Sequence, residues 1–462
     1  MTADDRVRAL LDTLGGQFDA GALLVNGQVS GSYAEDAMGR GVRPPVVLRP
    51  GSTEGVAAML AAADSLRQPL VIQGGRTGLS GAARPLAGEV SMSLERMTGI
   101  LALDAQAQTI TVLAGTPLQI VQEAALDAGL YFGVDIGARG TSAIGGNIAT
   151  NAGGIRVLRY GMFRAQVAGL EVVLADGSIL SSLKGLPKDN SGYDLNPLFI
   201  GTEGTLGVIT KACLKLHPKP KGERNALLAL PSLSAAQALL SRLRGEIGGL
   251  ISAFEIIFPD VYAETVGYMK LRPPVPVGSG LYAVVEIQGQ APEEDDARLE
   301  AALGAAIEDG LVEDAVLSSS GREFDEIWAI RDGINDYLFS LGAMENYDLA
   351  VPVSRIEEFV ARAETAVADI DRSARAFLFG HLGDGNLHYC VITEQAKSVS
   401  KAVYEAVASV GGGITAEHGI GTDKVAYLKL SRSDAEIAAM RRLKAAFDPN
   451  GILNAGRVFA AE

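Results

Sequence analysis

The histidines of this chain gather near its C-terminus, beside an acidic residue. Three of the four, His381, His388 and His418, lie in the last quarter, in the segments FGHLGDGNLHYCV and ITAEHGIG, and Glu417 directly precedes His418. Two imidazoles and one carboxylate can hold a divalent cation such as Zn, Mn or Fe and leave coordination positions open. A further imidazole beside them would serve as a base. Any one of these histidines alone is more often a core residue satisfied by backbone groups, but the group together favours a metal site.

Glycine-rich segments recur three times in the N-terminal half. The first, PLVIQGGRTGLSGAARP, runs from a strand-like stretch into Gly74, Gly75, Gly78 and Gly81, with Arg76 and Thr77 between them. Glycines let the backbone approach an anion closely, and successive N–H groups in such a turn make a nest for phosphate oxygens. A sharp turn without a ligand is the alternative, and the spacing matches neither the Walker nor the Rossmann pattern.

Two further glycine clusters carry small polar side chains. GVDIGARGTSAIGGNIATNAGG contains Gly145, Gly146, Gly153 and Gly154, and FIGTEGTLGVIT places Gly201, Gly204 and Gly207 before an apolar β-type run. Such residues can wrap an extended ligand and hydrogen-bond to its hydroxyl or diphosphate groups. Three loops of this kind in one domain are hard to explain as turns alone, so they predict a phosphate-bearing ligand.

The elements that must position these segments form two alternating patterns. Between Val46 and Thr210, strand-like and helical runs predict a mixed α+β domain with a βαβ unit over residues 46–73 and a hairpin turn at Asp176-Gly177. Prolines and charges in HPKPKGERNALLAL interrupt the periodicity and mark a boundary near residue 220. A second domain follows, in which a strand-rich sheet is covered by helices. Its last helix ends at a Pro-Asn-Gly stop, before an extended tail.

Composition and charge exclude several classes of protein. The 462 residues suffice for two or three domains, and 48% hydrophobic with 21% charged residues is ordinary for a globular chain. A formal net charge of -15 without a local basic patch argues against binding to nucleic acid or to an anionic membrane surface. Cys213 and Cys390 lie far apart without Cys-x-x-Cys spacing, so neither a disulfide framework nor an iron–sulfur site is indicated.

The chain lacks the marks of a membrane or secreted protein. The N-terminal segment MTADDRVRALLDTLGG reads as an acidic amphipathic helix, and no stretch reaches about 18 apolar residues without a charge. We therefore expect a cytoplasmic protein that is not integral to a membrane. Its oligomeric state stays open, with a homodimer as one alternative.

The order of the motifs GGRTGLSG, IGGNIATNAGG and NSGYDLNPLFIGTEGTLGVIT resembles the FAD domain of the vanillyl-alcohol oxidase and p-cresol methylhydroxylase (PCMH) superfamily. Within it, the chain is similar over nearly its full length to the branch of FAD-linked D-lactate and D-2-hydroxyglutarate dehydrogenases. The resemblance implies an α+β fold with a two-subdomain PCMH-type FAD-binding domain over residues 1–220. A substrate-binding cap domain with an antiparallel sheet covered by helices would span 221–425 and carry the metal site. A C-terminal helix and tail, 426–462, would pack back on the FAD domain.

The resemblance also assigns cofactor residues. In that family the first loop holds the FAD diphosphate, and the later two line the isoalloxazine and adenine ends. Carried over, the candidates are Gly74, Gly75, Arg76, Thr77, Gly78, Gly146, Asn147, Asn151, Gly153, Glu203 and Gly207. Some members attach FAD to a His or Cys, but no His or Cys of this chain lies in the first two glycine loops. The FAD is therefore expected to be bound non-covalently.

HLGDGNLH and AEHGIG resemble the family's metal and base motifs. This implies His381, His388 and Glu417 as ligands of a divalent metal, zinc or else manganese or iron, and His418 as the catalytic base. The metal would bind the carboxylate and C2 hydroxyl of a small D-2-hydroxy acid, while His418 takes the hydroxyl proton and a hydride passes from C2 to flavin N5. The reduced flavin then needs an electron acceptor that the sequence does not identify: a quinone, an electron-transfer flavoprotein or a cytochrome.

WAIRDGINDYLFSLGAMENYDLAVPV resembles the family's substrate-arginine segment and places Arg331 where a guanidinium contacts the substrate carboxylate, as a catalytic and substrate-binding residue. Three substrate-site positions depart from the pattern of the 2-hydroxyglutarate enzymes. Asn335 stands where they carry Thr, Asn346 where they carry Lys, and Cys390 where they carry Asn. Loss of the Lys weakens the case for a second substrate carboxylate. D-lactate, another monocarboxylic D-2-hydroxy acid and a larger hydroxy acid all stay open, as does 2-hydroxyglutarate through Arg331.

Two other functions compete with a metal-assisted D-2-hydroxyacid dehydrogenase. A flavin reductase that uses NADPH on the same scaffold, as in the UDP-N-acetylmuramate reductases, would not need the cluster of His381, His388 and Glu417. A non-catalytic flavin electron-transfer subunit would use the metal only for structure. Flavin bleaching by a hydroxy acid distinguishes the dehydrogenase from both.

Overall fold

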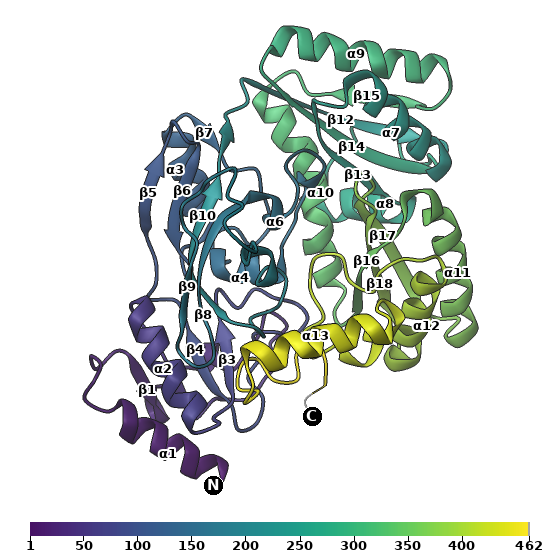
Figure 1. The fold of residues 1–462 in the computed structure, drawn as a ribbon. Coiled ribbons are helices and arrows are strands. Elements are labelled where there is room, and N and C mark those ends of the chain that lie inside the picture. Colours follow the sequence, from purple (N-terminus) through teal and green to yellow (C-terminus); the bar gives the residue numbers. More distant parts are fainter. Residues whose placement is uncertain (461–462) are drawn as a thin grey trace.

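A computed structural model of the chain describes residues 1–460, which form an N-terminal and a C-terminal half lying side by side (Figure 1). The N-terminal half begins with α1 (Ala3–Leu14) and a four-stranded sheet in the order β1-β2-β4-β3. The strands are β1 (Leu23–Val25), β2 (Val46–Leu48), β3 (Leu70–Gln73) and β4 (Val90–Ser93). β2, β3 and β4 run parallel, and α2 (Thr53–Ser65), capped by Ser52, connects β2 to β3. The predicted βαβ unit is present, with β4 inserted between its strands.

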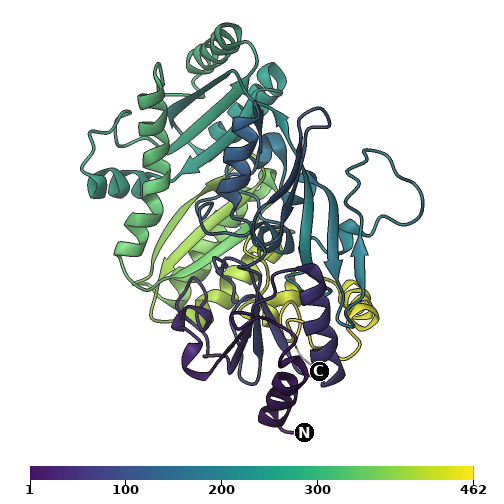
Figure 2. The same cartoon turned by 90° about the vertical axis from the view of Figure 1, so that its left-hand side faces the viewer.

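A five-stranded antiparallel sheet completes this half, in the order β5-β6-β10-β8-β9. Its strands are β5 (Ile100–Asp104), β6 (Thr109–Leu113), β8 (Val167–Val173), β9 (Ile179–Ser181) and β10 (Val208–Lys215). The hairpin turn predicted at Asp176-Gly177 joins β8 to β9. Between β6 and β8 lies the helix α3 (Leu118–Asp127), and β7 (Leu130–Tyr131) pairs with β11 (His217–Pro218). Residues 182–196 project as a long loop after β9 (Figure 2).

The second glycine cluster is not a loop throughout, contrary to expectation. Ile144–Thr150 form helix α4, followed by α5 (Val157–Tyr160) and α6 (Phe163–Gln166). A Cβ at Gly145 would lie 2.8 Å from the Cβ of Ala114, directly after β6, so only glycine lets the helix approach this closely. Tertiary packing here outweighs the low helix propensity of glycine.

The C-terminal half is built on a seven-stranded sheet in which every neighbouring pair is antiparallel, in the order β15-β12-β14-β13-β17-β18-β16. The strands are β12 (Gly222–Leu230), β13 (Ile251–Ile257), β14 (Leu281–Gly289), β15 (Asp314–Leu317), β16 (Glu345–Ala350), β17 (Arg375–His381) and β18 (Asn386–Ile392). Their side chains alternate between two separate buried clusters, one on each face. The sheet is therefore buried on both sides, and the predicted helix-covered antiparallel sheet is confirmed.

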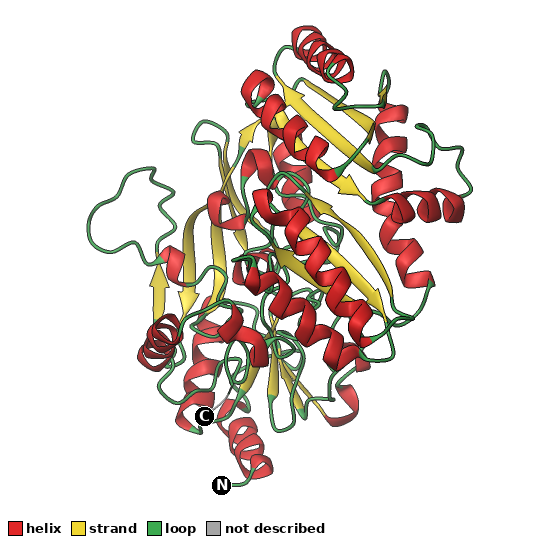
Figure 3. Ribbon diagram, turned by 90° about the vertical axis from the view of Figure 1, so that its right-hand side faces the viewer, coloured by secondary structure: helices red, strands yellow, loops and turns green. Residues whose placement is uncertain are grey.

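Helices cover the two faces unequally. α7 (Leu233–Ile247), α9 (Pro292–Glu308), α11 (Ile356–Ile370) and α12 (Ala396–Ser409) pack on the outer face (Figure 3). α8 (Pro259–Met269) and α10 (Gly321–Ser340) pack on the inner face. The inner face also meets the N-terminal half, since α5 contacts β13. Polar side chains that point from this face are consequently enclosed between the halves.

The C-terminal segment returns to the N-terminal half. The expected helix is α13 (Asp434–Phe447), preceded by the 3-10 helix η5 (Val425–Leu430). After it, Leu70 donates its N–H to Ile452 O at 2.7 Å, and Lys444 Nζ donates to Thr205 O at 2.8 Å. We propose, on these contacts, that the chain divides near residues 220 and 425 as expected. The other 3-10 helices are η1 (Asn26–Gln28), η2 (Gly31–Tyr33), η3 (Asn196–Leu198) and η4 (Val353–Arg355).

Within residues 1–460, no helix combines the length and apolarity needed to cross a membrane.

Candidate active site

The register of the seven-stranded sheet gathers the chemistry-bearing residues of the C-terminal half on its inner face. In the hairpin of β17 and β18, Phe379 pairs with His388, and His381 follows two residues later on the same side. On the flanking strands, Glu255 pairs with His381, and Asp348 pairs with His388. Paired residues project to the same side of a sheet. Four strands thus bring two imidazoles and two carboxylates together.

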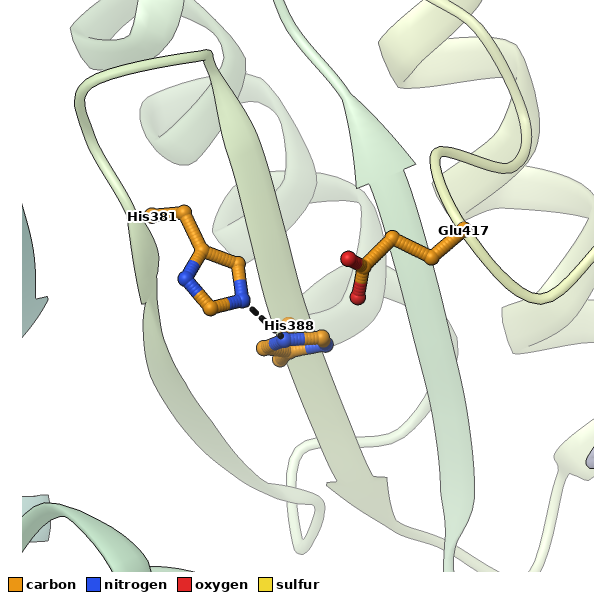
Figure 4. Close-up of side chains that lie close together, drawn as sticks. All are labelled: His381, His388 and Glu417. Carbon is orange, nitrogen blue, oxygen red and sulfur yellow. Dashed lines mark hydrogen bonds between the residues drawn. The ribbon is translucent and has the colours of Figure 1, made fainter. Parts of the chain in front are cut away.

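His381, His388 and Glu417 converge at the end of this hairpin (Figure 4). The two histidine Nε2 atoms lie 3.4 Å apart, and one ligand atom from each of the three side chains lies within 4.8 Å of the others. Two nitrogen ligands on a tetrahedral zinc ion, each at about 2.0–2.1 Å, are about 3.3 Å apart. The donor set therefore fits a divalent cation, with positions left open for a substrate.

Asp348 fixes the loop that carries Glu417 and His418. Its Oδ2 accepts the backbone N–H groups of both residues at 2.8 Å, and that of Ala416 at 3.2 Å. Across the junction, the backbone N–H of Gly154 donates to Glu417 Oε1. A fully buried carboxylate thus holds the loop in place, and the N-terminal half holds the Glu417 side chain.

Each candidate ligand histidine has a buried carboxylate behind it. Glu255 Oε1 lies 2.5 Å from His381 Nδ1, which leaves His381 Nε2 to face His388. Asp348 Oδ1 lies 4.0 Å from His388 Nδ1. Carboxylates in this position orient metal-ligating imidazoles and raise their basicity. Both carboxylates are enclosed, so their effect is little screened by water.

Burial and charge give the two histidines opposite protonation behaviour. Burial lowers the pKa of His381, but Glu255 outweighs it and raises that pKa to about 9. Burial and the neighbouring His381 lower the pKa of His388 to about 3. Burial also raises the pKa of Glu417. Two imidazoles this close cannot both be in the charged imidazolium form, whereas a cation shared by their Nε2 atoms satisfies both.

His418 faces the same cavity as the three candidate ligands. Its Nδ1 lies 3.8 Å from Asp348 Oδ2, and Ser80 Oγ donates to its backbone carbonyl at 2.7 Å. Burial lowers the pKa of His418, and Asp348 only partly offsets this effect. At neutral pH the imidazole is therefore uncharged and able to accept a proton.

Arg331 lies on α10 beside the metal-ligand candidates and is buried. Its Nε donates to Glu255 Oε2 at 2.8 Å, so a single carboxylate anchors both Arg331 and His381. Its guanidinium carbon lies 4.9 Å from the centre of the Phe379 ring. Among residues 1–460 no hydrogen bond involves its two terminal nitrogens, which remain available for a carboxylate.

The other three substrate candidates lie at different depths. Asn335 and Asn346 line the cavity with Arg331. Cys390 is buried outside the cavity lining, behind Asn346, whose Oδ1 lies 3.6 Å from its Sγ. Burial raises the pKa of the Cys390 thiol to about 12. The structure therefore places Cys390 as a support for Asn346 and not as a cavity residue.

A second cavity lies in the N-terminal half and shares wall residues with the first. Nine of the eleven FAD candidates line it: Gly74, Gly75, Arg76, Thr77, Gly78, Gly146, Asn147, Glu203 and Gly207. Thr77, Gly78, Asn147 and Thr150 line both cavities, and Gly153 lines only the one that holds the histidines. The cavity of the glycine loops thus adjoins the cavity of the candidate metal site.

The glycines of this space divide into two groups. A Cβ at Gly75 would lie 2.1 Å from Thr141 O, so packing within the protein requires glycine there. A Cβ at Gly78 or Gly146 would meet no atom within 4 Å and would project into the cavity. Arg76 Nη1 is buried and makes no hydrogen bond among residues 1–460, and its ion-pair contact with Glu95 Oε2 is long, at 3.7 Å. Bare backbone and a guanidinium nitrogen that makes no hydrogen bond within the described residues fit the phosphate-bearing FAD.

Two FAD candidates are engaged by the protein itself. Asn151, in a left-handed conformation at the end of α4, accepts the Arg164 N–H at 2.8 Å and lines neither cavity. Glu203 accepts the N–H groups of Ile420 and Gly421, both at 2.7 Å, so it ties the third glycine loop to the loop of His418. Glu203 also lines the N-terminal cavity. Its carboxylate links the N-terminal half to the loop that carries His418.

Sequence reasoning missed Glu255, Asp348 and a buried ion pair at the junction. Arg156 of the N-terminal half donates from Nε and Nη2 to Glu286 of the sheet, at 2.8 and 2.9 Å. The one available signal was an acidic residue inside each apolar strand run, as in SAFEIIF and LYAVVEIQG. Acidic residues are rarely fully buried without a partner, so each of these positions indicated an enclosed cation or imidazole.

The chain matches two family models. Residues 44–182 match "FAD binding domain", and residues 219–458 match "FAD linked oxidases, C-terminal domain". Among solved structures, p-cresol methylhydroxylase aligns with TM-score 0.78 at 15% identity, over 99% of this chain and 97% of that one. 4-Ethylphenol oxidase from Gulosibacter chungangensis aligns with TM-score 0.76 at 19% identity, over 99% and 98%. The expected PCMH-type α+β fold is confirmed.

Sequence relatives narrow the class. A D-2-hydroxyglutarate dehydrogenase of Stutzerimonas stutzeri is 35% identical over 98% of this chain and 99% of its own length. One from Xanthomonas citri pv. viticola is 39% identical over 90% and 89%, and the mitochondrial enzyme of Bos taurus is 38% identical over 88% and 76%. The chain is an FAD-binding oxidoreductase. It belongs to the FAD-linked oxidases, in the family of D-2-hydroxyacid dehydrogenases.

Proposed function

We propose that the chain oxidises a D-2-hydroxy acid to the 2-oxo acid, using non-covalent FAD and a divalent metal held by His381, His388 and Glu417. The observation that carries this proposal is that the cavity of the glycine loops adjoins the cavity of these three residues, which Arg331 and His418 also line. The names of the relatives support the hydroxy-acid class of substrate. Support for non-covalent binding is that no His or Cys belongs to the described lining of the N-terminal cavity.

The residues of the cavity have separate tasks. When bound, FAD supplies the acceptor for the hydride that leaves C2, and the metal supplies positive charge beside the substrate hydroxyl. The terminal nitrogens of Arg331 bind the substrate carboxylate. Uncharged His418 accepts the hydroxyl proton as the hydride leaves, so the substrate loses two electrons and two protons. Asp348 stabilises the imidazolium that forms, because its Oδ2 lies 3.8 Å from His418 Nδ1.

The positions of Glu255 and Asp348 support this mechanism. Glu255 fixes the spacing between a metal ligand and the carboxylate-binding arginine, since His381 and Arg331 share its two oxygens. Asp348 fixes the position of the loop that carries Glu417 and His418, because it accepts the backbone N–H groups of both residues. Small errors in the placement of reacting groups are costly for rate, so both carboxylates act as positioning residues.

Anaerobic mixing with D-2-hydroxy acids tests the proposed function. The flavin absorption band should bleach with a D-acid and not with its L-enantiomer, and the metal chelator EDTA should prevent the bleaching. Bleaching by NADPH alone would instead favour the flavin reductase, and no bleaching by any D-2-hydroxy acid would favour the electron-transfer subunit. A dye-linked panel with a quinone, an electron-transfer flavoprotein and a cytochrome would then identify the acceptor.

A further inference from the structure

The charge of the substrate cavity changes from the metal end to its mouth. Arg331, Asn335 and Phe339 are spaced four residues apart on α10 and line the same cavity. Residues at this spacing lie one above another on a single helix face. The wall therefore presents a guanidinium, then a carboxamide, then an aromatic ring that is 68% exposed.

Arg331 is held at the metal end of this series. It shares Glu255 with the ligand candidate His381, and its guanidinium carbon lies 4.9 Å from the Phe379 ring. The Phe379 ring centre in turn lies 5.0 Å from that of His388. The guanidinium is therefore positioned for the carboxylate next to the reacting carbon. The guanidinium cannot reach the outer part of the cavity without breaking its hydrogen bond to Glu255.

Within residues 1–460, no Lys or Arg lines the outer part of the cavity. Among the described lining residues, Arg331 is the one Lys or Arg. Asp332 lines the wall, and no hydrogen bond or ion pair involves its carboxylate within residues 1–460. Arg139, near the same wall, is bound to Asp135 at 2.5 Å, and Asp135 also binds Arg156. A second substrate carboxylate would therefore meet the like charge of Asp332 on this wall.

We propose that the preferred substrate is a D-2-hydroxy acid with one carboxylate and an uncharged, hydrogen-bonding chain, and that Asn335 and Asn346 determine this preference. The inference rests on the proposed function. Asn346 accepts from Cys390 through Oδ1, which leaves its amide N–H groups to donate to an uncharged oxygen of the chain. Phe339 covers the end of the chain at the mouth. The relatives named for 2-hydroxyglutarate act on a dicarboxylate, so this chain differs in substrate class.

The decisive comparison uses two substrates of equal length and shape. D-2-hydroxyglutarate and its 5-amide differ in one charge. We expect kcat/KM to be at least about tenfold higher for the amide, mainly through KM, because the distal group contacts only the outer wall. Titration of the oxidised enzyme with 2-oxoglutarate and with 2-oxoglutaramate, followed by the flavin difference spectrum, measures the same preference without turnover.

A variant of Asn346 separates charge from size. Asn346→Lys adds an ammonium to the outer wall and should shift the ratio of kcat/KM toward D-2-hydroxyglutarate by about tenfold or more. Asn346→Met introduces a side chain of about the length of lysine but without its charge. This variant should not shift the ratio of kcat/KM toward D-2-hydroxyglutarate.

The outcomes distinguish the inference from the function on which it rests. Equal or better turnover of D-2-hydroxyglutarate by the unmodified enzyme overturns the inference and leaves the proposed function standing. An unchanged ratio in Asn346→Lys removes Asn346 as a determinant of specificity. Should no D-2-hydroxy acid bleach the flavin, both proposals fall. The comparison of the two substrates on the unmodified enzyme decides the matter even when the Lys variant does not fold.

Discussion

In the N-terminal half, the candidate cofactor residues come from three short segments, each continuous in sequence, whereas the candidate metal site of the C-terminal half draws on four strands and a loop. The first arrangement depends on bare backbone, as at Gly78 and Gly146, and tolerates few side chains. The second depends on buried carboxylates that hold imidazoles, as Glu255 holds His381. A local change should therefore act locally in the first half, whereas one change in the second should disturb several groups together.

The largest effect should come from removing a metal ligand. His388→Ala should lose the metal and reduce flavin bleaching by more than about 10⁴-fold, because the substrate hydroxyl then lacks adjacent positive charge. The flavin should stay bound, since His388 does not line the N-terminal cavity. Metal content and the flavin-to-protein ratio, measured on one sample, check both parts. A full complement of metal in the variant would contradict the assignment of His388.

The next largest effect should come from removing the proposed base, His418, while the metal ligands stay in place. His418→Ala should keep both the metal and the flavin but slow substrate-driven bleaching by about 10³-fold, because within residues 1–460 the other two histidines that line the cavity are the candidate metal ligands. Stopped-flow absorbance measures the rate at saturating substrate. Bleaching at the normal rate would remove His418 from the mechanism.

Glu255 and Glu286, two buried glutamates of the same sheet, should respond differently to the same substitution. Glu255→Gln should weaken metal binding by about 10- to 100-fold, because Glu255 orients His381 from behind. Glu286→Gln, on the same inner face, should instead lower the free energy of unfolding by about 3 kcal/mol, because it breaks the buried pair with Arg156. Competition with a chromophoric chelator and denaturant unfolding measure the two quantities. Equal metal affinity in both variants would refute the role of Glu255.

The smallest effects test the N-terminal half. Gly78→Ala should fold normally but bind FAD about tenfold more weakly, since its methyl group projects into the cavity. Gly75→Ala should destabilise the fold by about 1–3 kcal/mol, because its Cβ would lie 2.1 Å from Thr141 O. Flavin fluorescence titration and thermal unfolding distinguish the two. Unchanged FAD affinity in Gly78→Ala would show that the cofactor does not approach this backbone.

Much of the fold was predictable because its signals are local. The helix α2 with its Ser52 cap, the hairpin of β8 and β9, and the Pro-Asn-Gly stop after α13 all follow from residues within a few positions of each other. Helix α4 was not predicted, because glycine disfavours a helix locally and only the close approach of Gly145 to Ala114 favours it.

The sequence by itself determined the family and supplied the candidates for the FAD loops and the metal site, because motif order and residue type are properties of short segments. Only the tertiary structure decided that Glu255 lies behind His381, that Asp348 holds the loop of His418, and that Cys390 lies outside the cavity. Strand register fixes these relations, and a shift of one residue would turn each side chain to the opposite face. Register depends on the packing of the whole sheet, which no single segment encodes.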